Sequence, residues 1–200
     1  MYARETFKRT FERLTGVGVP SAGLARGAVR ARRPQTFWFQ DDGTIPNNPS
    51  LPFICYRSCV RLSESRDPAA LFEELFAQNG WQQSWRNGIC EYVHYHSSIH
   101  EVLGIARGHA RVKFGGDGGK TLSLRAGDVV VLPAGTGHQC LWASDDLLVV
   151  GAYPAGGAYD ECEGSPQQHA RALESIPRVP LPAGNPIYGA DGSLAELWGM

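Results

Sequence analysis

The stretch GICEYVHYHSSIHEVLGIARG, residues 88–108, holds two histidines that are two positions apart, followed five positions later by a glutamate. Successive side chains of a β-strand point to opposite faces, so His94 and His96 are expected to share one face. The Ser97-Ser98 pair predicts a short turn, after which Glu101 can face the same interior. The stretch therefore predicts that two imidazoles and one carboxylate converge.

A second stretch, GDVVVLPAGTGH at residues 127–138, predicts a buried strand, a turn rich in Pro and Gly, and then a third histidine. Three neutral imidazoles and one carboxylate suit a first-row divalent ion such as Mn, Fe, Co, Ni or Zn. Structural zinc sites are closed tetrahedra rich in Cys, whereas four such ligands on a six-coordinate ion leave two neighbouring positions open. Side chains of these types would therefore suit one divalent transition-metal ion at an open site.

Together, the two stretches resemble the paired motifs of the cupin superfamily, G-x5-H-x-H-x4-E-x6-G and G-x5-P-x-G-x2-H. Three further phrases, DDGTIPNNP at 41–49, YHSSIHEVLG at 95–104 and VVGAYP at 149–154, resemble the YjlB-like group of single-domain cupins. The resemblance covers roughly residues 36–198 and implies one cupin domain with one metal site. At that site it implies that one divalent transition-metal ion is held by His94, His96, Glu101 and His138. It does not choose a reaction, because cupins include dioxygenases, decarboxylases, isomerases, sugar-binding modules and seed storage proteins.

Short apolar runs separated by turn residues follow one another from residue 88 to residue 154, and the chain has 24 Gly and 13 Pro. Such even spacing of short strands predicts an all-β jelly roll, the double-stranded β-helix of a single cupin barrel. Asp67 and Pro68 predict the start of a helix that ends at Asn79-Gly80, and residues 167–174 allow a second, shorter one. The expected fold is therefore a jelly roll with one or two peripheral helices.

The first part of the chain differs in charge from the rest. Residues 1–33 carry eight Lys/Arg and two Asp/Glu, a net +6, and the remaining residues carry −7. We expect residues 1–35 to be a basic arm, with a linker over residues 20–36, and residues 36–200 to be the cupin domain. The Arg-rich amphipathic start also resembles an organelle transit segment, but its two acidic residues weaken that interpretation. A cytoplasmic location is therefore expected, with an organellar one as the alternative.

Composition limits the expected partners. The formal net charge of −1 gives no overall electrostatic case for nucleic acid, and no apolar stretch is long enough to span a bilayer. Five cysteines without a C-x-x-C pair indicate unpaired thiols in a reducing compartment. The apolar run Phe37-Trp38-Phe39 leaves surface to cover, which favours a homodimer formed by strand addition. The expected partners are a small-molecule substrate or ligand and a second copy of the chain, with no nucleic acid and no membrane.

Strand alternation also assigns roles to the neighbours of the four ligands. Tyr92 is the candidate catalytic residue, as a hydrogen-bond donor behind the ligands, and the alternative is a core tyrosine whose hydroxyl is satisfied elsewhere. His100 is expected to turn outward, at the surface or behind the ligands. Trp142 is expected to fill the barrel interior, at a position where many cupins carry Asn. Cys90 and Cys140 fall near the ion by position, and we expect both to be small buried apolar residues.

These observations favour a metal-dependent enzyme that acts on a small molecule, with an Fe(II) dioxygenase as the leading hypothesis. A substrate would chelate the ion through two oxygens, or an oxygen and a sulfur, at the open positions. Isomerases and decarboxylases at such an ion need a positioned acid or base, and the spacing reveals no further inward carboxylate. A non-catalytic cupin, in which the ion anchors a small organic acid or sugar, is the alternative outside enzymes.

Overall fold

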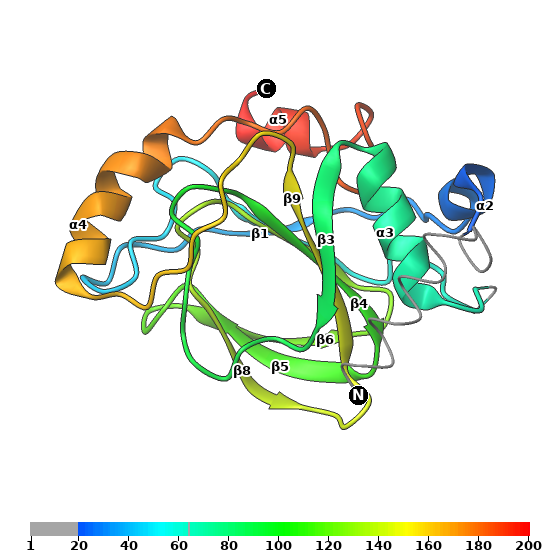
Figure 1. Cartoon of the computed structure of the whole chain (residues 1–200), viewed down its shortest axis with the longest axis horizontal. Coiled ribbons are helices and arrows are strands. Elements are labelled where there is room, and N and C mark those ends of the chain that lie inside the picture. Colours follow the sequence, from blue (N-terminus) through cyan, green and yellow to red (C-terminus); the bar gives the residue numbers. More distant parts are fainter. Residues whose placement is uncertain (1–19, 64) are drawn as a thin grey trace.

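A computed structural model of the chain describes residues 20–63 and 65–200, which form two antiparallel sheets that face each other (Figure 1). The large sheet has the strand order β1-β2-β7-β4-β9-β3, and the small sheet has the order β6-β5-β8. The strands of the large sheet are β1 Gln35–Phe37, β2 Phe53–Tyr56, β3 Trp81–Asn87, β4 Glu101–Arg107, β7 Val129–Leu132 and β9 Leu148–Pro154. Those of the small sheet are β5 His109–Phe114, β6 Lys120–Arg125 and β8 His138–Ala143. This arrangement confirms the all-β jelly roll with peripheral helices.

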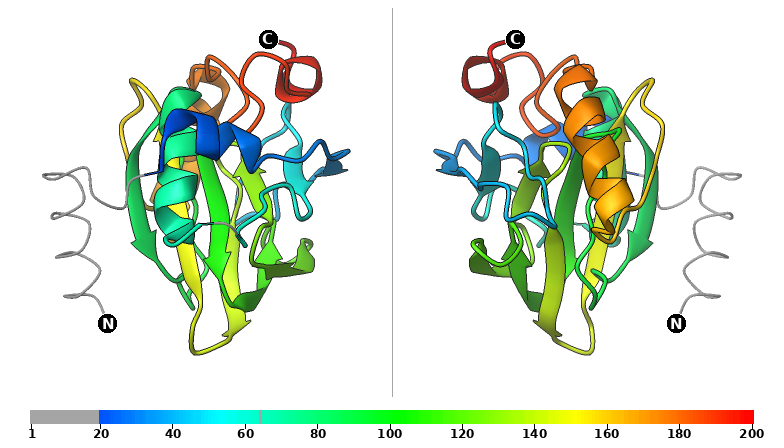
Figure 2. Two further views of the ribbon diagram at one scale, coloured as in Figure 1. Left: turned by 90° about the vertical axis from the view of Figure 1, so that its right-hand side faces the viewer. Right: turned by 90° about the vertical axis from the view of Figure 1, so that its left-hand side faces the viewer.

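The helices lie outside the two sheets, with α2 and α3 on one side of the molecule and α4 on the opposite side (Figure 2). Their bounds are α2 Ala22–Gly27, α3 Pro68–Gln78, α4 Pro166–Ser175 and α5 Leu194–Trp198, with a 3-10 turn at Ile176–Arg178. The predicted helix α3 is confirmed, because the Asp67 side chain accepts a hydrogen bond from the Ala69 N–H and Pro68 occupies the first turn. The second expected helix is α4, which begins with a capping box at Ser165.

The described segment before β1 packs against the folded domain. Residues 20–36, expected to be a linker, contain α2, which packs on α3 and fully buries Ala25. Val29 forms an isolated bridge with Val60. The rest of the expected basic arm and of the possible transit segment, residues 1–19, lies outside the described residues.

Both faces of the large sheet are buried along its central strands β4 and β7. On β4, Leu103 and Ile105 point into the interior between the sheets, whereas Val102 and Ala106 point outward to the core beneath α3. β7 has the same two-sided burial over four consecutive apolar residues, so it forms a continuous apolar run and not an alternating one. Because the side-chain period of a strand is two, Glu101 falls on the same inner face as Leu103. The large sheet therefore presents one carboxylate to the interior.

The two histidines of the first stretch do not lie in a regular strand. Residues 88–100 cross from β3 to β4, and the strand expected here is reduced to isolated bridges, one of them between His94 and His138. The local backbone still directs His94 and His96 to the same side, towards His138. His138 begins β8 of the small sheet, and Glu101 begins β4 of the large sheet. The four predicted ligands thus come from both sheets and from the segment that connects them.

The prediction that Trp142 fills the interior is wrong. Its side chain is 50% exposed and packs on the ring of His109, with the ring centroids 5.1 Å apart. The cause is a register shift between β5 and β8, where consecutive residues of β5 pair with Trp142 and Cys140. Leu141 is the extra residue of this bulge, and it reverses the alternation after Cys140.

His100 turns away from Glu101, as alternation predicts, but it is not at the surface. It is 1% exposed, because α5 covers this face and places the Trp198 ring 4.7 Å from the imidazole. The His100 Nδ1 atom accepts a hydrogen bond from the Ala134 N–H at 2.9 Å. His100 therefore holds the turn that precedes His138.

One edge of the large sheet is formed by β1, and the adjacent Trp38 is 56% exposed. Self-association through this edge stays a prediction. Across residues 20–63 and 65–200, no helix combines the length and the apolar character needed to cross a membrane.

Gly104 of β4 lies directly against the Phe72 ring of α3. A Cβ atom at this position would lie 2.6 Å from Phe72 Cδ1, closer than van der Waals contact allows. We predict that Gly104→Ala lowers the free energy of unfolding by about 1–3 kcal/mol, because the packed interface has no room for the added methyl group. Chemical denaturation measures this change, and the double variant Gly104→Ala/Phe72→Leu should regain part of the loss. If the loss of unfolding free energy in the double variant equals the sum of the losses in the two single variants, the two residues are not in direct contact and the account is contradicted.

Candidate metal centre

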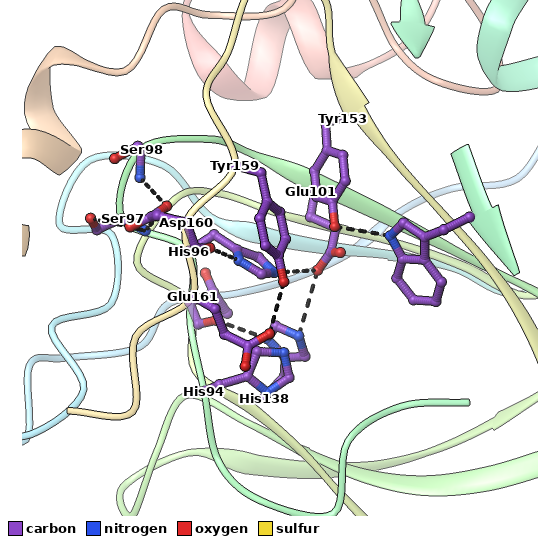
Figure 3. Close-up of polar contacts among 12 residues, drawn as sticks. His94, His96, Ser97, Ser98, Glu101, His138, Tyr153, Tyr159, Asp160 and Glu161 are labelled. Atoms are coloured by element: carbon purple, nitrogen blue, oxygen red, sulfur yellow. Dashed lines mark hydrogen bonds and ion pairs between the residues drawn. The ribbon is translucent and has the colours of Figure 1, made fainter. Parts of the chain in front are cut away.

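The four predicted ligands lie close together between the two sheets (Figure 3). One ring nitrogen each of His94, His96 and His138 lies within 4.8 Å of the other two, and all three side chains are buried. The Oε2 atom of Glu101 lies 3.4 Å from the Nε2 atom of His96 and 3.5 Å from that of His138. One carboxylate and three imidazoles therefore share a small buried volume.

Backbone carbonyls orient the three imidazoles. Each ring places its Nδ1 atom within hydrogen-bond distance of a carbonyl oxygen, and a carbonyl can only accept, so Nδ1 carries the hydrogen. This tautomer leaves the lone pair of each Nε2 atom free for a metal ion, which is how metal-binding histidines are commonly held. The acceptors are Tyr92 O for His94 at 3.4 Å, Asp160 O for His96 at 2.5 Å and Thr136 O for His138 at 3.2 Å.

Glu101 gives the strongest indication that the cluster holds a cation. Its side chain is 2% exposed, and its Oε2 atom has no hydrogen-bond partner among the described residues. Burying an uncompensated carboxylate is costly, yet two imidazole Nε2 atoms lie at ion-pair distance from this oxygen. A divalent cation between them would satisfy the carboxylate and the nitrogen lone pairs together. The donor set therefore fits such an ion.

Without an ion, the cluster holds a proton instead. Burial lowers the pKa of His96, but the Glu101 carboxylate outweighs burial and raises that pKa to about 9. Burial also opposes ionisation of Glu101, and the nearby imidazoles, His96 first, hold its pKa below the usual value. Burial lowers the pKa of His138 to about 3, and burial together with the charge of His96 lowers the pKa of His94. Near neutral pH the site therefore contains a Glu101–His96 ion pair and two neutral imidazoles.

The cluster lines a cavity of about 470 Å³. Trp85 and Leu103 form part of its apolar wall, and the Trp85 Nε1–H donates a hydrogen bond to the Tyr153 hydroxyl at 2.9 Å. Gly151 makes room for the indole, because a Cβ atom there would lie 2.1 Å from Trp85 Cε2. A cavity of this size accepts a small organic molecule.

A segment that follows β9, residues 155–165, borders the cavity, and we call it the strap. The Asp160 carboxylate fastens the strap by accepting hydrogen bonds from the N–H groups of Ser97 and Ser98, each at 3.0 Å, and from the Ser97 hydroxyl at 2.6 Å. The Asp160 carbonyl also orients His96. Sequence reasoning missed the strap, because these partners lie 62 to 64 positions apart and share no periodic pattern.

The strap brings a second carboxylate to the cavity. Tyr92 and Tyr159 each donate a hydrogen bond to Glu161, both at 2.8 Å. Glu161 lines the cavity while it stays exposed to solvent, so the cavity has a further carboxylate that the spacing did not reveal. No strand spacing signals Glu161, because it belongs to the irregular strap.

Tyr92 is exposed to solvent and does not lie behind the ligands. Its side chain is 46% exposed, and its ring centroid lies 5.4 Å from that of His94. The hydroxyl of Tyr92 contacts Glu161, and the backbone carbonyl is the group that orients His94. A catalytic role for Tyr92 stays a prediction.

The two cysteines near the site differ in their surroundings. Cys140 is buried in the core between the sheets, as expected. Cys90 is partly exposed and lines the cavity. All five cysteines are unpaired.

Known proteins resemble this chain in sequence. A family model described as EutQ-like cupin domain matches residues 82–153. The Bacillus subtilis (strain 168) protein named Uncharacterized protein YjlB is 40% identical over 167 residues, which cover 84% of this chain and 98% of that protein.

Similar solved structures include acireductone dioxygenase from Bacillus anthracis with a cadmium ion in its active centre, at 18% identity and a TM-score of 0.34. That match covers 44% of this chain and 61% of the dioxygenase chain. A mutant of Bacillus subtilis oxalate decarboxylase matches at 16% identity and a TM-score of 0.32, over 68% of this chain and 29% of that chain. The chain thus spans less than two thirds of each of these structures, and likenesses of this size assign no reaction. The 40% identity over most of both chains does establish the family, and this chain belongs to the cupin superfamily, in its YjlB-like group.

Proposed function

We propose that the protein is a metal-dependent enzyme that acts on a small chelating molecule, and that its reaction is that of an Fe(II) dioxygenase. The observation that carries this proposal is the buried Glu101 Oε2 atom, which has no hydrogen-bond partner in the described part of the chain and faces two imidazole Nε2 atoms. Fe(II) held there would supply a Lewis acid with two neighbouring open positions for substrate and O2. The residues that would hold the ion are His94, His96, Glu101 and His138.

The other residues of the cavity would orient the substrate and exclude water. Trp85 and Leu103 supply apolar surface next to the ligands. Burial, followed by the charge of Glu101, raises the pKa of Tyr153, so its hydroxyl stays protonated at neutral pH. The Tyr153 hydroxyl oxygen accepts the Trp85 N–H, and the same hydroxyl has the Glu101 carboxylate as a hydrogen-bond partner. Tyr153 is therefore suited to hold the Glu101 carboxylate in position.

Oxygen chemistry remains better supported than isomerase or decarboxylase chemistry, although Glu161 lines the cavity. The Tyr159 hydroxyl, as the largest influence, holds the pKa of Glu161 below the usual value of a glutamate. Burial and then the Glu161 carboxylate raise the pKa of Tyr159. Both groups thus titrate far from neutral pH, whereas an efficient general acid or base titrates near the working pH. Glu161 is better suited to binding than to proton transfer.

Metal binding should release one proton per ion at pH 7.5, because His96 is protonated in the metal-free protein and must be neutral to bind. Affinity for Co(II) should accordingly rise about tenfold per pH unit below the His96 pKa of about 9. Isothermal titration calorimetry in buffers of different ionisation enthalpy counts the protons. His96→Ala should weaken binding by about 100-fold or more, whereas His169→Ala, which removes a histidine paired with Asp41, should not. A pH-independent affinity would contradict this account of the site.

The iron-loaded protein should consume O2 in the presence of a suitable substrate, and an oxygen electrode with a panel of thiols, diketones and catechols tests this directly. The zinc-loaded protein and the His138→Ala variant should consume none, because zinc is not redox-active and the variant lacks a ligand. His169→Ala should behave as the wild type.

Iron-loaded protein that consumes no oxygen with any member of the panel would count against the dioxygenase. Anaerobic turnover by the zinc-loaded protein would point instead to isomerase or decarboxylase chemistry.

A further inference from the structure

The charge of the cavity wall limits the kind of molecule that fits it. Of the described residues that line the cavity, none is Lys or Arg, and two are carboxylates, Glu101 and Glu161. Glu101 faces the imidazoles and would coordinate the ion. Glu161 belongs to the strap and has no cationic partner among the lining residues. Among these lining residues, Glu161 therefore faces the cavity without a Lys or Arg beside it.

The residues immediately before and after Glu161 fix its position in the strap. Its predecessor, Asp160, is fixed by three hydrogen bonds to the Ser97-Ser98 turn. Its successor, Cys162, exchanges two backbone hydrogen bonds with Tyr95, at 2.9 Å and 3.0 Å. The carboxylate itself accepts one hydrogen bond on each oxygen. A carboxylate has about four acceptor sites, so Glu161 can accept further donors without losing its two tyrosines.

Aromatic rings lie beside this carboxylate. The Tyr159 ring lies 5.0 Å from the His96 ring and 5.5 Å from the Tyr153 ring, centroid to centroid. Trp85 lines the same cavity. The faces of tyrosine and tryptophan rings attract cations. The rings and Glu161 therefore both favour a positively charged group in the ligand.

We propose that the substrate carries a protonated amine which Glu161 binds, in addition to an anionic group that chelates the metal ion. This inference rests on the proposed function and identifies the class of its substrate. A divalent ion balances the charges of Glu101 and Glu161, so a ligand with one negative and one positive end keeps the cavity neutral. A second negative group would face Glu161 with no Lys or Arg to receive it. An ammonium group would form a charge-assisted hydrogen bond to Glu161.

Three hydroxamic acids of equal length test the proposal, because all of them chelate a metal ion through the same two oxygens. 3-Aminopropanohydroxamic acid ends in an ammonium group, butyrohydroxamic acid in a methyl group and succinic monohydroxamic acid in a carboxylate. Dissociation constants are measured by calorimetry on zinc-loaded protein, which performs no oxidation. The amine should bind about tenfold more tightly than the methyl compound, and the carboxylate should bind most weakly.

The Glu161→Gln variant should bring the amine and methyl compounds within about twofold of each other, because the charge-assisted bond is lost. With both proteins saturated with zinc, its affinity for butyrohydroxamic acid should stay unchanged, which a merely structural role for Glu161 would not allow. Glu163→Gln is the matched control, since this residue lies two positions along the strap, is exposed and does not line the cavity. It should keep the wild-type preference.

Equal binding of the three compounds by the wild type, or a preference for the amine that survives Glu161→Gln, would overturn the assignment of an amine while leaving the metal site intact. Binding of none of the three, with no difference between zinc-loaded and metal-free protein, would overturn the proposed function as well. If Glu161→Gln does not fold, the order of the three dissociation constants measured on the wild type still tests whether the cavity prefers an amine.

Discussion

A buried carboxylate that faces three imidazoles is the constraint on which the rest of the molecule depends. Glu101 is almost completely buried, and its Oε2 atom lies 3.4 Å and 3.5 Å from the Nε2 atoms of His96 and His138. Such a group is stable inside a protein only when positive charge lies beside it. In the metal-free protein a proton on His96 provides that charge. A divalent ion would provide more of it, and would use all three nitrogen lone pairs.

The fold brings these groups together from separate parts of the structure. The large sheet supplies Glu101 at the start of β4, and the small sheet supplies His138 at the start of β8. The irregular segment between β3 and β4 supplies His94 and His96, and the strap fixes the orientation of His96 through the Asp160 carbonyl. Both faces of the large sheet are packed, so the carboxylate projects from a rigid layer. A site on such a layer can hold an ion while the less regular strap determines what reaches it.

The ligands and α3 were predictable because their signals are local. Alternation along a strand placed Glu101 inward, and the Asp-Pro start with the Asn-Gly end delimited α3. The Trp142 side chain was wrongly predicted to face the interior because a single bulge in β8 reverses the alternation of side chains between the two faces. No residue type in the sequence indicates this bulge. The burial of His100 depends on the C-terminal helix, almost a hundred positions later in the chain.

Glu161 and Asp160 escaped prediction for a different reason. They lie in a segment without periodicity, and only the folded chain brings it to the metal ligands. The metal ligands could therefore be predicted from their spacing together with the resemblance to the cupin motifs, whereas Glu161 and Asp160 could not.

X-ray absorption spectroscopy of the zinc-loaded protein tests the central claim most directly. The account predicts scattering from three imidazole rings and one further oxygen donor, all at about 2.0–2.2 Å from the ion, with no sulfur. Fewer than three imidazoles, or a sulfur atom at about 2.3 Å such as the nearby Cys90 would supply, would contradict it.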